Sequence, residues 1–182
     1  MTFSLSPVDV LLVLLWLSVV ALAAQHGFLG LLVGLVGTLL LKPLLLLSEV
    51  SPLLSLACAL VVGFLLSLVL RPFPRLSTRQ PAYGRVLGAF GGVLLGSALV
   101  LALTVSLPLG RDLNGGVRYP DPKMPYAGAL QRSRLVEVGR AILLYPLLEQ
   151  SGQVAPEVRG ALSVLHTMFV VGQPWEGGKR EQ

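Results

Sequence analysis

Long stretches of this chain carry no charge, and that feature restricts what the chain can fold into. Only two charged residues, Lys42 and Glu49, occur between positions 10 and 70, and none occurs between positions 86 and 110. Charge-free apolar runs separated by short polar segments are typical of membrane-spanning helices. Only 13% of the residues are charged, whereas a soluble domain has roughly 25%. The sequence therefore predicts an all-α integral membrane protein.

Four apolar segments are expected to cross the bilayer. They are residues 8–24, 28–47, 52–70 and 84–107. We place a tight turn at residues 25–27, because one helix over residues 10–41 would be about 48 Å long at about 1.5 Å per residue. The hydrocarbon core is only about 30 Å thick. A re-entrant hairpin over residues 8–47 is the alternative. Since residues 1–9 contain no Lys or Arg, we expect the first segment to be a retained span and not a signal peptide.

The predicted organisation has four parts. They are a transmembrane four-helix region (1–109), a polar loop (110–128), an amphipathic helical C-terminal region (129–173) and a disordered tail (174–182). Two helices are expected in the C-terminal region, over residues 132–148 and 157–171, where apolar residues recur at helical spacing. These helices can lie on the membrane surface or pack on each other as a hairpin.

The basic residues are unevenly distributed. Four of the fourteen, Arg71, Arg75, Arg79 and Arg85, fall in one segment that contains no acid. Basic residues gathered in one inter-helix loop indicate the cytoplasmic side. We therefore expect residues 71–85 to be cytoplasmic and the C-terminal region to be non-cytoplasmic. The segment after Gly110 holds nine basic and seven acidic residues. This near-balance argues against nucleic-acid binding, which usually needs a basic face.

Glycines recur at strict four-residue spacing in the last apolar segment. The series is Gly84, Gly88, Gly92 and Gly96. Such spacing gives a helix one flat face, on which another helix can approach closely. Two interpretations remain open: packing inside the bundle, or contact with a second copy or a partner protein. A second series could supply the facing surface, and it consists of Gly27, Gly30, Gly34 and Gly37.

No residue pattern resembles an active site. The two histidines, His26 and His166, and the single Cys58 are too few for a cysteine–histidine metal centre. No glycine loop followed by a lysine is present to bind phosphate. We therefore expect no catalytic, cofactor-binding or metal-binding residues and no enzymatic activity.

A small transporter or channel subunit is the rival interpretation. Ionisable residues inside a membrane usually mark transport paths, but Asp9, Lys42 and Glu49 all lie near predicted helix ends, where side chains reach the headgroups. The modest polar candidates for a path are Thr38, Ser55, Ser67, Ser97 and Thr104.

Residues 7–108 resemble the colicin V production protein (CvpA) family of small bacterial membrane proteins. Asp9 opens a leucine-rich first helix, a glycine-containing turn follows at residues 27–30, and residues 83–96 are similar to the family's glycine-rich entry to its fourth helix. The family usually carries arginines around the first turn, where this chain has Gln25 and His26. The resemblance implies a multi-pass protein of the bacterial cytoplasmic (inner) membrane that supports toxin secretion or envelope homeostasis. From the apolar segments and the glycine spacing, we expect the lipid bilayer and a second copy or another membrane protein as partners.

Overall fold

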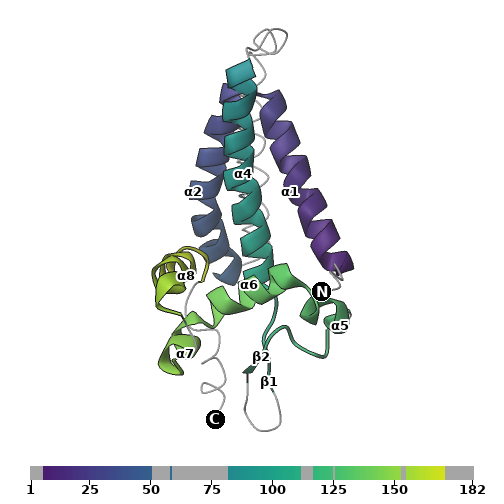
Figure 1. The fold of residues 1–182 in the computed structure, drawn as a ribbon, viewed down its shortest axis with the longest axis vertical. Coiled ribbons are helices and arrows are strands. Elements are labelled where there is room, and N and C mark those ends of the chain that lie inside the picture. Colours follow the sequence, from purple (N-terminus) through teal and green to yellow (C-terminus); the bar gives the residue numbers. More distant parts are fainter. Residues whose placement is uncertain are drawn as a thin grey trace. The chain divides into compact units, whose positions relative to one another are not determined.

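A computed structural model describes residues 6–50, 58, 82–111, 117–124, 126–152 and 155–170. Its elements, labelled in Figure 1, are α1 (Pro7–Gln25), α2 (Phe28–Val50), α4 (Ala82–Val105), β1 (Gly110–Arg111), β2 (Val117–Arg118), α5 (Ala127–Gln131), α6 (Arg134–Leu143), α7 (Tyr145–Gln150) and α8 (Pro156–Phe169). Helices dominate, and the two short strands pair antiparallel.

Three helices, α1, α2 and α4, are long and apolar enough to cross a membrane. The expectation of a helical membrane protein is confirmed to this extent. The predicted span over residues 52–70 lies outside the described residues, apart from Cys58, which is helical. The contacts of the chain divide it into two compact units, one of residues 13–100 and one of residues 1–12 with 101–182.

The first unit begins with a reversal between α1 and α2 at Gly27. This residue has a φ of 57°, a left-handed conformation that favours glycine because a Cβ would be strained there. The helix that follows continues through Pro43 to Val50. Proline is tolerated in membrane helices when the freed backbone groups find other partners.

Glycines bring the three long helices of this unit into backbone contact. A Cβ added at Gly91 of α4 would lie 2.6 Å from the Gly30 carbonyl oxygen of α2. One at Gly92 would lie 2.7 Å from the Cα of Val20 of α1. Real Cβ atoms do not approach so closely, so only glycine fits these positions. The glycine side of α4 thus lies against α1 and α2 of the same chain.

The contacts also give the relative directions of the helices. Along α4, Gly88 faces the end of α1 and Gly96 faces Trp16, nearer its start. These two helices are therefore antiparallel, and the Trp16 indole N–H donates to the Ser97 hydroxyl across them at 3.1 Å. Between α2 and α4, Gly34 lies beside Gly91 and Gly37 lies beside Leu95. The residue numbers of the contacting positions therefore increase together in the two helices. The helices α2 and α4 are therefore parallel.

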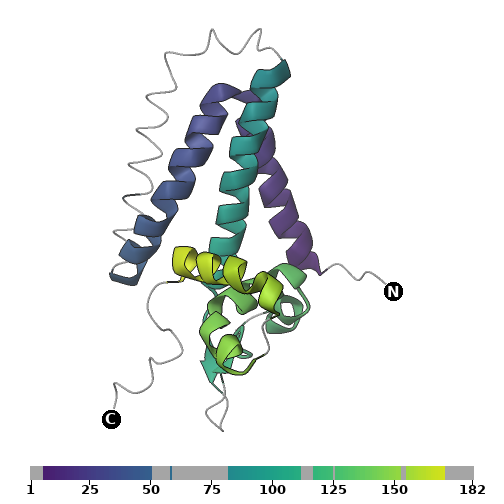
Figure 2. The same cartoon turned by 60° about the vertical axis from the view of Figure 1, so that its left-hand side comes forward.

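The second unit has a small apolar core that includes the last residue of α4. Five buried side chains form it, namely Val105, Tyr119, Val136, Ile142 and Leu143. Leu162, Leu165 and Phe169 of α8 pack against this core, and Figure 2 shows α8 lying beside α6 and α7. Two placements were considered for the C-terminal helices, on the membrane surface or packed on each other. In the structure, α6 and α8 pack on each other.

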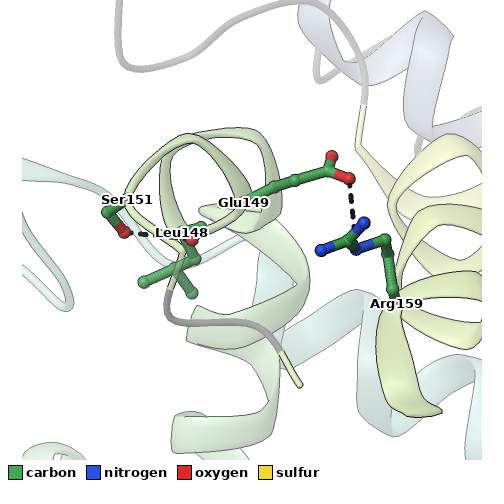
Figure 3. A network of polar contacts seen from close by, with 4 residues as sticks. All are labelled: Leu148, Glu149, Ser151 and Arg159. Carbon is green, nitrogen blue, oxygen red and sulfur yellow. Dashed lines mark hydrogen bonds and ion pairs between the residues drawn. The ribbon is translucent and has the colours of Figure 1, made fainter. Parts of the chain in front are cut away.

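The C-terminal helices differ in detail from the expectation. The prediction of one helix over residues 132–148 is wrong. In the structure α6 ends at Leu143 and a separate helix, α7, begins at Tyr145. Pro146 explains the break, since proline has no backbone N–H to continue a helix and is accommodated in a first turn. The end of α7 is joined to α8 by an exposed ion pair, with 3.5 Å between Glu149 Oε1 and Arg159 Nε (Figure 3).

Candidate functional site

A buried carboxylate joins the start of α1 to the start of α6. Asp9 is only 4% exposed. Its Oδ1 accepts a hydrogen bond from the Ser133 hydroxyl at 2.6 Å and one from the Leu135 N–H at 3.2 Å. Its Oδ2 accepts from the N–H groups of Arg134 and Ser6, each at 3.3 Å. Four donors therefore surround this side chain, which offsets the cost of burying its charge.

The sequence builds this site from two helix N-termini. Ser6 and Asp9 form a capping box at the start of α1, in which the Ser6 hydroxyl accepts from the Val8 N–H at 3.4 Å. Ser133 caps α6 and accepts from the Val136 N–H at 3.2 Å. Backbone N–H groups at a helix start lack partners within the helix and attract a negative charge. One carboxylate thus serves both helices.

Two further contacts fix the same unit. The Ser6 hydroxyl donates to the Ala129 carbonyl of α5 at 2.9 Å. Gly139 lets α6 cross the end of α4 closely, because a Cβ added there would lie 2.7 Å from the Thr104 side chain. The starts of α1 and α6 and the end of α4 are therefore held in one compact unit.

A polar cavity of about 420 Å³ opens in this unit. Its lining consists of Arg118, Tyr119, Pro120, Leu130, Gln131, Val136, Glu137 and Arg140. Tyr119 is 6% exposed, and its hydroxyl has no hydrogen-bond partner among the described residues. Burial raises the pKa of the Tyr119 phenol, so this side chain stays a neutral donor near neutral pH.

The residues predicted to orient and pack the chain are only partly described. Arg71, Arg75 and Arg79 lie outside the described residues, and Arg85 is exposed in the first turns of α4. Gly84, Gly88, Gly92 and Gly96 are all buried. The last three lie against α1 or its turn.

Three of the polar residues considered for a transport path are described, and each has a partner. The Thr38 hydroxyl donates to the Gly34 carbonyl at 2.8 Å, and the Thr104 hydroxyl donates to the Leu101 carbonyl at 2.9 Å. Ser97 is the acceptor for Trp16. Ser55 and Ser67 lie outside the described residues. In the described part of the chain, no three His, Cys, Asp or Glu side chains are grouped so as to hold a metal ion.

Comparison with known proteins adds no relative. No family model matches the sequence, and neither the curated proteins nor the solved structures give a match. The resemblance to the CvpA family therefore stands on the residues quoted above and stays a prediction.

Sequence reasoning missed Ser133, Tyr119 and Arg140. The spacing of Ser6 and Asp9 is a recognisable capping box, which was the available signal for a structural role of Asp9. Nothing local to the sequence pairs Asp9 with Ser133, since 124 positions separate them.

Proposed function

We propose that this chain is a non-enzymatic bacterial inner-membrane protein, similar to CvpA proteins, that supports toxin secretion or envelope homeostasis by helix packing with itself or with partners. The observation that carries the proposal is the Asp9 site. It joins the first turn of α1 to the start of α6, and a domain joined to a span in this way can present a constant surface to a neighbour.

The directions of the described helices support the proposal of four spans. Because α2 and α4 are parallel, the end of α2 and the start of α4 belong on opposite sides of the membrane. We infer that the chain crosses once more between Val50 and Ala82. The start of α1 and the end of α4 lie in one unit, which agrees with an even number of crossings.

The orientation follows from the arginines. If Arg71, Arg75, Arg79 and Arg85 face the cytoplasm, then α4 leads away from it. The domain formed by α5–α8 then lies on the non-cytoplasmic side, together with the start of α1. One side of α8 remains exposed there, with Val158, Val164 and Met168 about half accessible. This side is suited to the membrane surface.

Partner contact would use surfaces other than the α4 glycines, because α1 and α2 already cover them. The exposed large apolar residues on α1 include Leu11 and Leu22, and those on α2 include Leu32 and Leu39. In a bilayer these side chains meet lipid or a second membrane protein.

The transporter alternative has less support from the described residues. Thr38 and Thr104 are bonded within their own helices, and Ser97 is bonded to Trp16. The Asp9 carboxylate is occupied by four protein donors, which favours an anchoring role over proton transfer.

Deletion of the gene tests the proposed function. We expect leakage of an envelope enzyme, increased detergent sensitivity, or reduced export of a toxin. Expression of the wild-type protein in the deletion strain should reverse the defect. Expression of the Asp9→Ala variant, at a matched level in the membrane, should not reverse it. Glu157→Gln, which changes an exposed acid on α8, is the control. A deletion strain with an intact envelope and unchanged export would contradict the proposal.

A further inference from the structure

The cavity beside Tyr119 has features that are not needed to attach the domain formed by α5–α8 to α1. Its volume of about 420 Å³ lies within the range of roughly 300–1,000 Å³ typical of small-molecule sites. It is lined largely by polar side chains. The buried Tyr119 hydroxyl lacks a partner among the described residues, and leaving such a group unpaired is unfavourable. A bound ligand would supply the missing partner.

The lining offers two kinds of polar group. Arg118 and Arg140 carry positive charges, and arginine is especially suited to phosphate oxygens. Glu137 carries a negative charge one helical turn from Arg140 on α6. A carboxylate repels a bare anion but accepts hydrogen bonds from hydroxyl groups. Gln131 and Tyr119 can donate and accept. The ligand should therefore combine a phosphate with hydroxyl groups.

Because α4 is a candidate span, we expect the cavity to lie near the lipid headgroups. Tyr119 and Val136, which line it, share a core with Val105. Val105 is the last residue of the candidate span formed by α4. The polar interface of a bilayer extends roughly 5–7 Å beyond the hydrocarbon core on each side. A site just past the end of a span can thus be reached both by a headgroup and by a soluble molecule.

We propose that this cavity binds a phosphate ester of a small polyol, for which glycerol phosphate is the simplest representative. Arg118 and Arg140 bind the phosphate, while Glu137, Gln131 and Tyr119 bind the hydroxyl groups. The same chemistry is present in the headgroup of phosphatidylglycerol and in free glycerol 3-phosphate.

Binding should be measured on the full-length protein purified in a neutral detergent and stripped of lipid. One arm titrates free glycerol 3-phosphate by calorimetry. The other adds phosphatidylglycerol in mixed micelles and counts bound lipids by native mass spectrometry, with phosphatidylcholine as the comparison lipid. Binding in the first arm identifies a soluble ligand, and binding in the second arm alone identifies the headgroup. Either result supports the proposal.

Variants assign the binding to the cavity. Arg118→Gln combined with Arg140→Gln should weaken binding at least about tenfold, because two charge-assisted contacts are lost. Arg159→Gln removes an exposed arginine that pairs with Glu149 outside the cavity (Figure 3), and it should bind as wild type does.

Tyr119→Phe keeps the test decisive if the double variant fails to fold. It should weaken binding about fivefold while leaving the melting temperature of the unliganded protein unchanged or higher, since the unpaired hydroxyl is gone. The proposal is overturned if neither probe binds, if phosphatidylcholine binds equally well, or if the cavity variants bind as the wild type does.

Discussion

The Ser133 hydroxyl donates a 2.6 Å hydrogen bond to the Asp9 carboxylate, joining the first turn of α1 to the N-cap of α6. Asp9 lies in the first turn of α1, which is a candidate span. Ser133 lies immediately before α6. The contact therefore joins the start of a candidate span to the helices that follow α4. Both side chains are nearly inaccessible to solvent, which makes the pair sensitive to substitution.

Asp9→Ala is expected to destabilise the protein by about 3 kcal/mol, since it leaves buried donors at two helix starts unpaired. Asp9→Asn should cost less, because the amide oxygen still accepts. Thermal unfolding in detergent and limited proteolysis of residues 101–170 measure the effect. Glu157→Gln is the exposed control. Equal melting temperatures for Asp9→Ala and the control would contradict the anchoring role.

The pairing itself can be tested by a double-mutant cycle. Asp9→Ala and Ser133→Ala should be non-additive by about 1 kcal/mol or more, as expected for residues in one hydrogen-bonded network. The melting temperatures of both single variants and the double variant provide the measurement. Strict additivity would mean that the two side chains stabilise the protein independently.

Replacing Gly88 and Gly92 together with leucine should separate α4 from α1. A Cβ at Gly88 would already lie 2.6 Å from the Gly27 carbonyl oxygen, and added volume in a packed interface costs about 1–3 kcal/mol per site. We expect altered migration on mild-detergent gels and a lower melting temperature. The matched control replaces Gly128 and Gly160, where an added Cβ meets nothing within 4 Å. Wild-type behaviour of the Gly88/Gly92 variant would refute close packing at these glycines.

Reporter fusions test the orientation. An enzyme that is active only outside the cytoplasm should work when fused after Gln182 and be silent when fused after Gln80. A cytoplasm-only reporter at the same two positions should give the opposite pattern. Activity of the first reporter after Gln80 and its silence after Gln182 would reverse the proposed orientation.

The stability of the folded protein should fall at alkaline pH because of the buried Tyr119 side chain. Burial raises the pKa of Tyr119 in the folded protein above the unfolded value of about 10. Its stabilising contribution is therefore fully present below pH about 10 and is lost as the pH rises further. Tyr119→Phe should reduce the loss of melting temperature above pH about 10. Tyr126→Phe, which alters a side chain that is 83% exposed, should not. Identical pH profiles for the two variants would contradict this.

Local features of the sequence were sufficient to predict the three long apolar helices. Hydropathy over about 20 residues is a local property, so α1, α2 and α4 begin and end within a few residues of expectation. The turn at residues 25–27 was predicted because one helix over residues 10–41 would be longer than the hydrocarbon core is thick. The break between α6 and α7 could have been predicted from Pro146, because proline ends helices by a local mechanism.

Tertiary contacts account for what the sequence did not predict. Asp9 was expected to reach the headgroups, yet it is buried against Ser133. That outcome depends on α6 returning to the start of α1. The cavity gathers Arg118 from β2, Gln131 from α5 and Arg140 from α6. No spacing pattern links these residues, and only the folded chain brings them together.

Purification in mild detergent from native membranes, after brief chemical cross-linking, tests the central claim most directly. The protein is proposed to act by packing with itself or with a membrane partner. Quantitative mass spectrometry should therefore find a stoichiometric partner, or the cross-linked species should be a homo-oligomer. A monomer that carries lipid but no stoichiometric protein would contradict the proposed function.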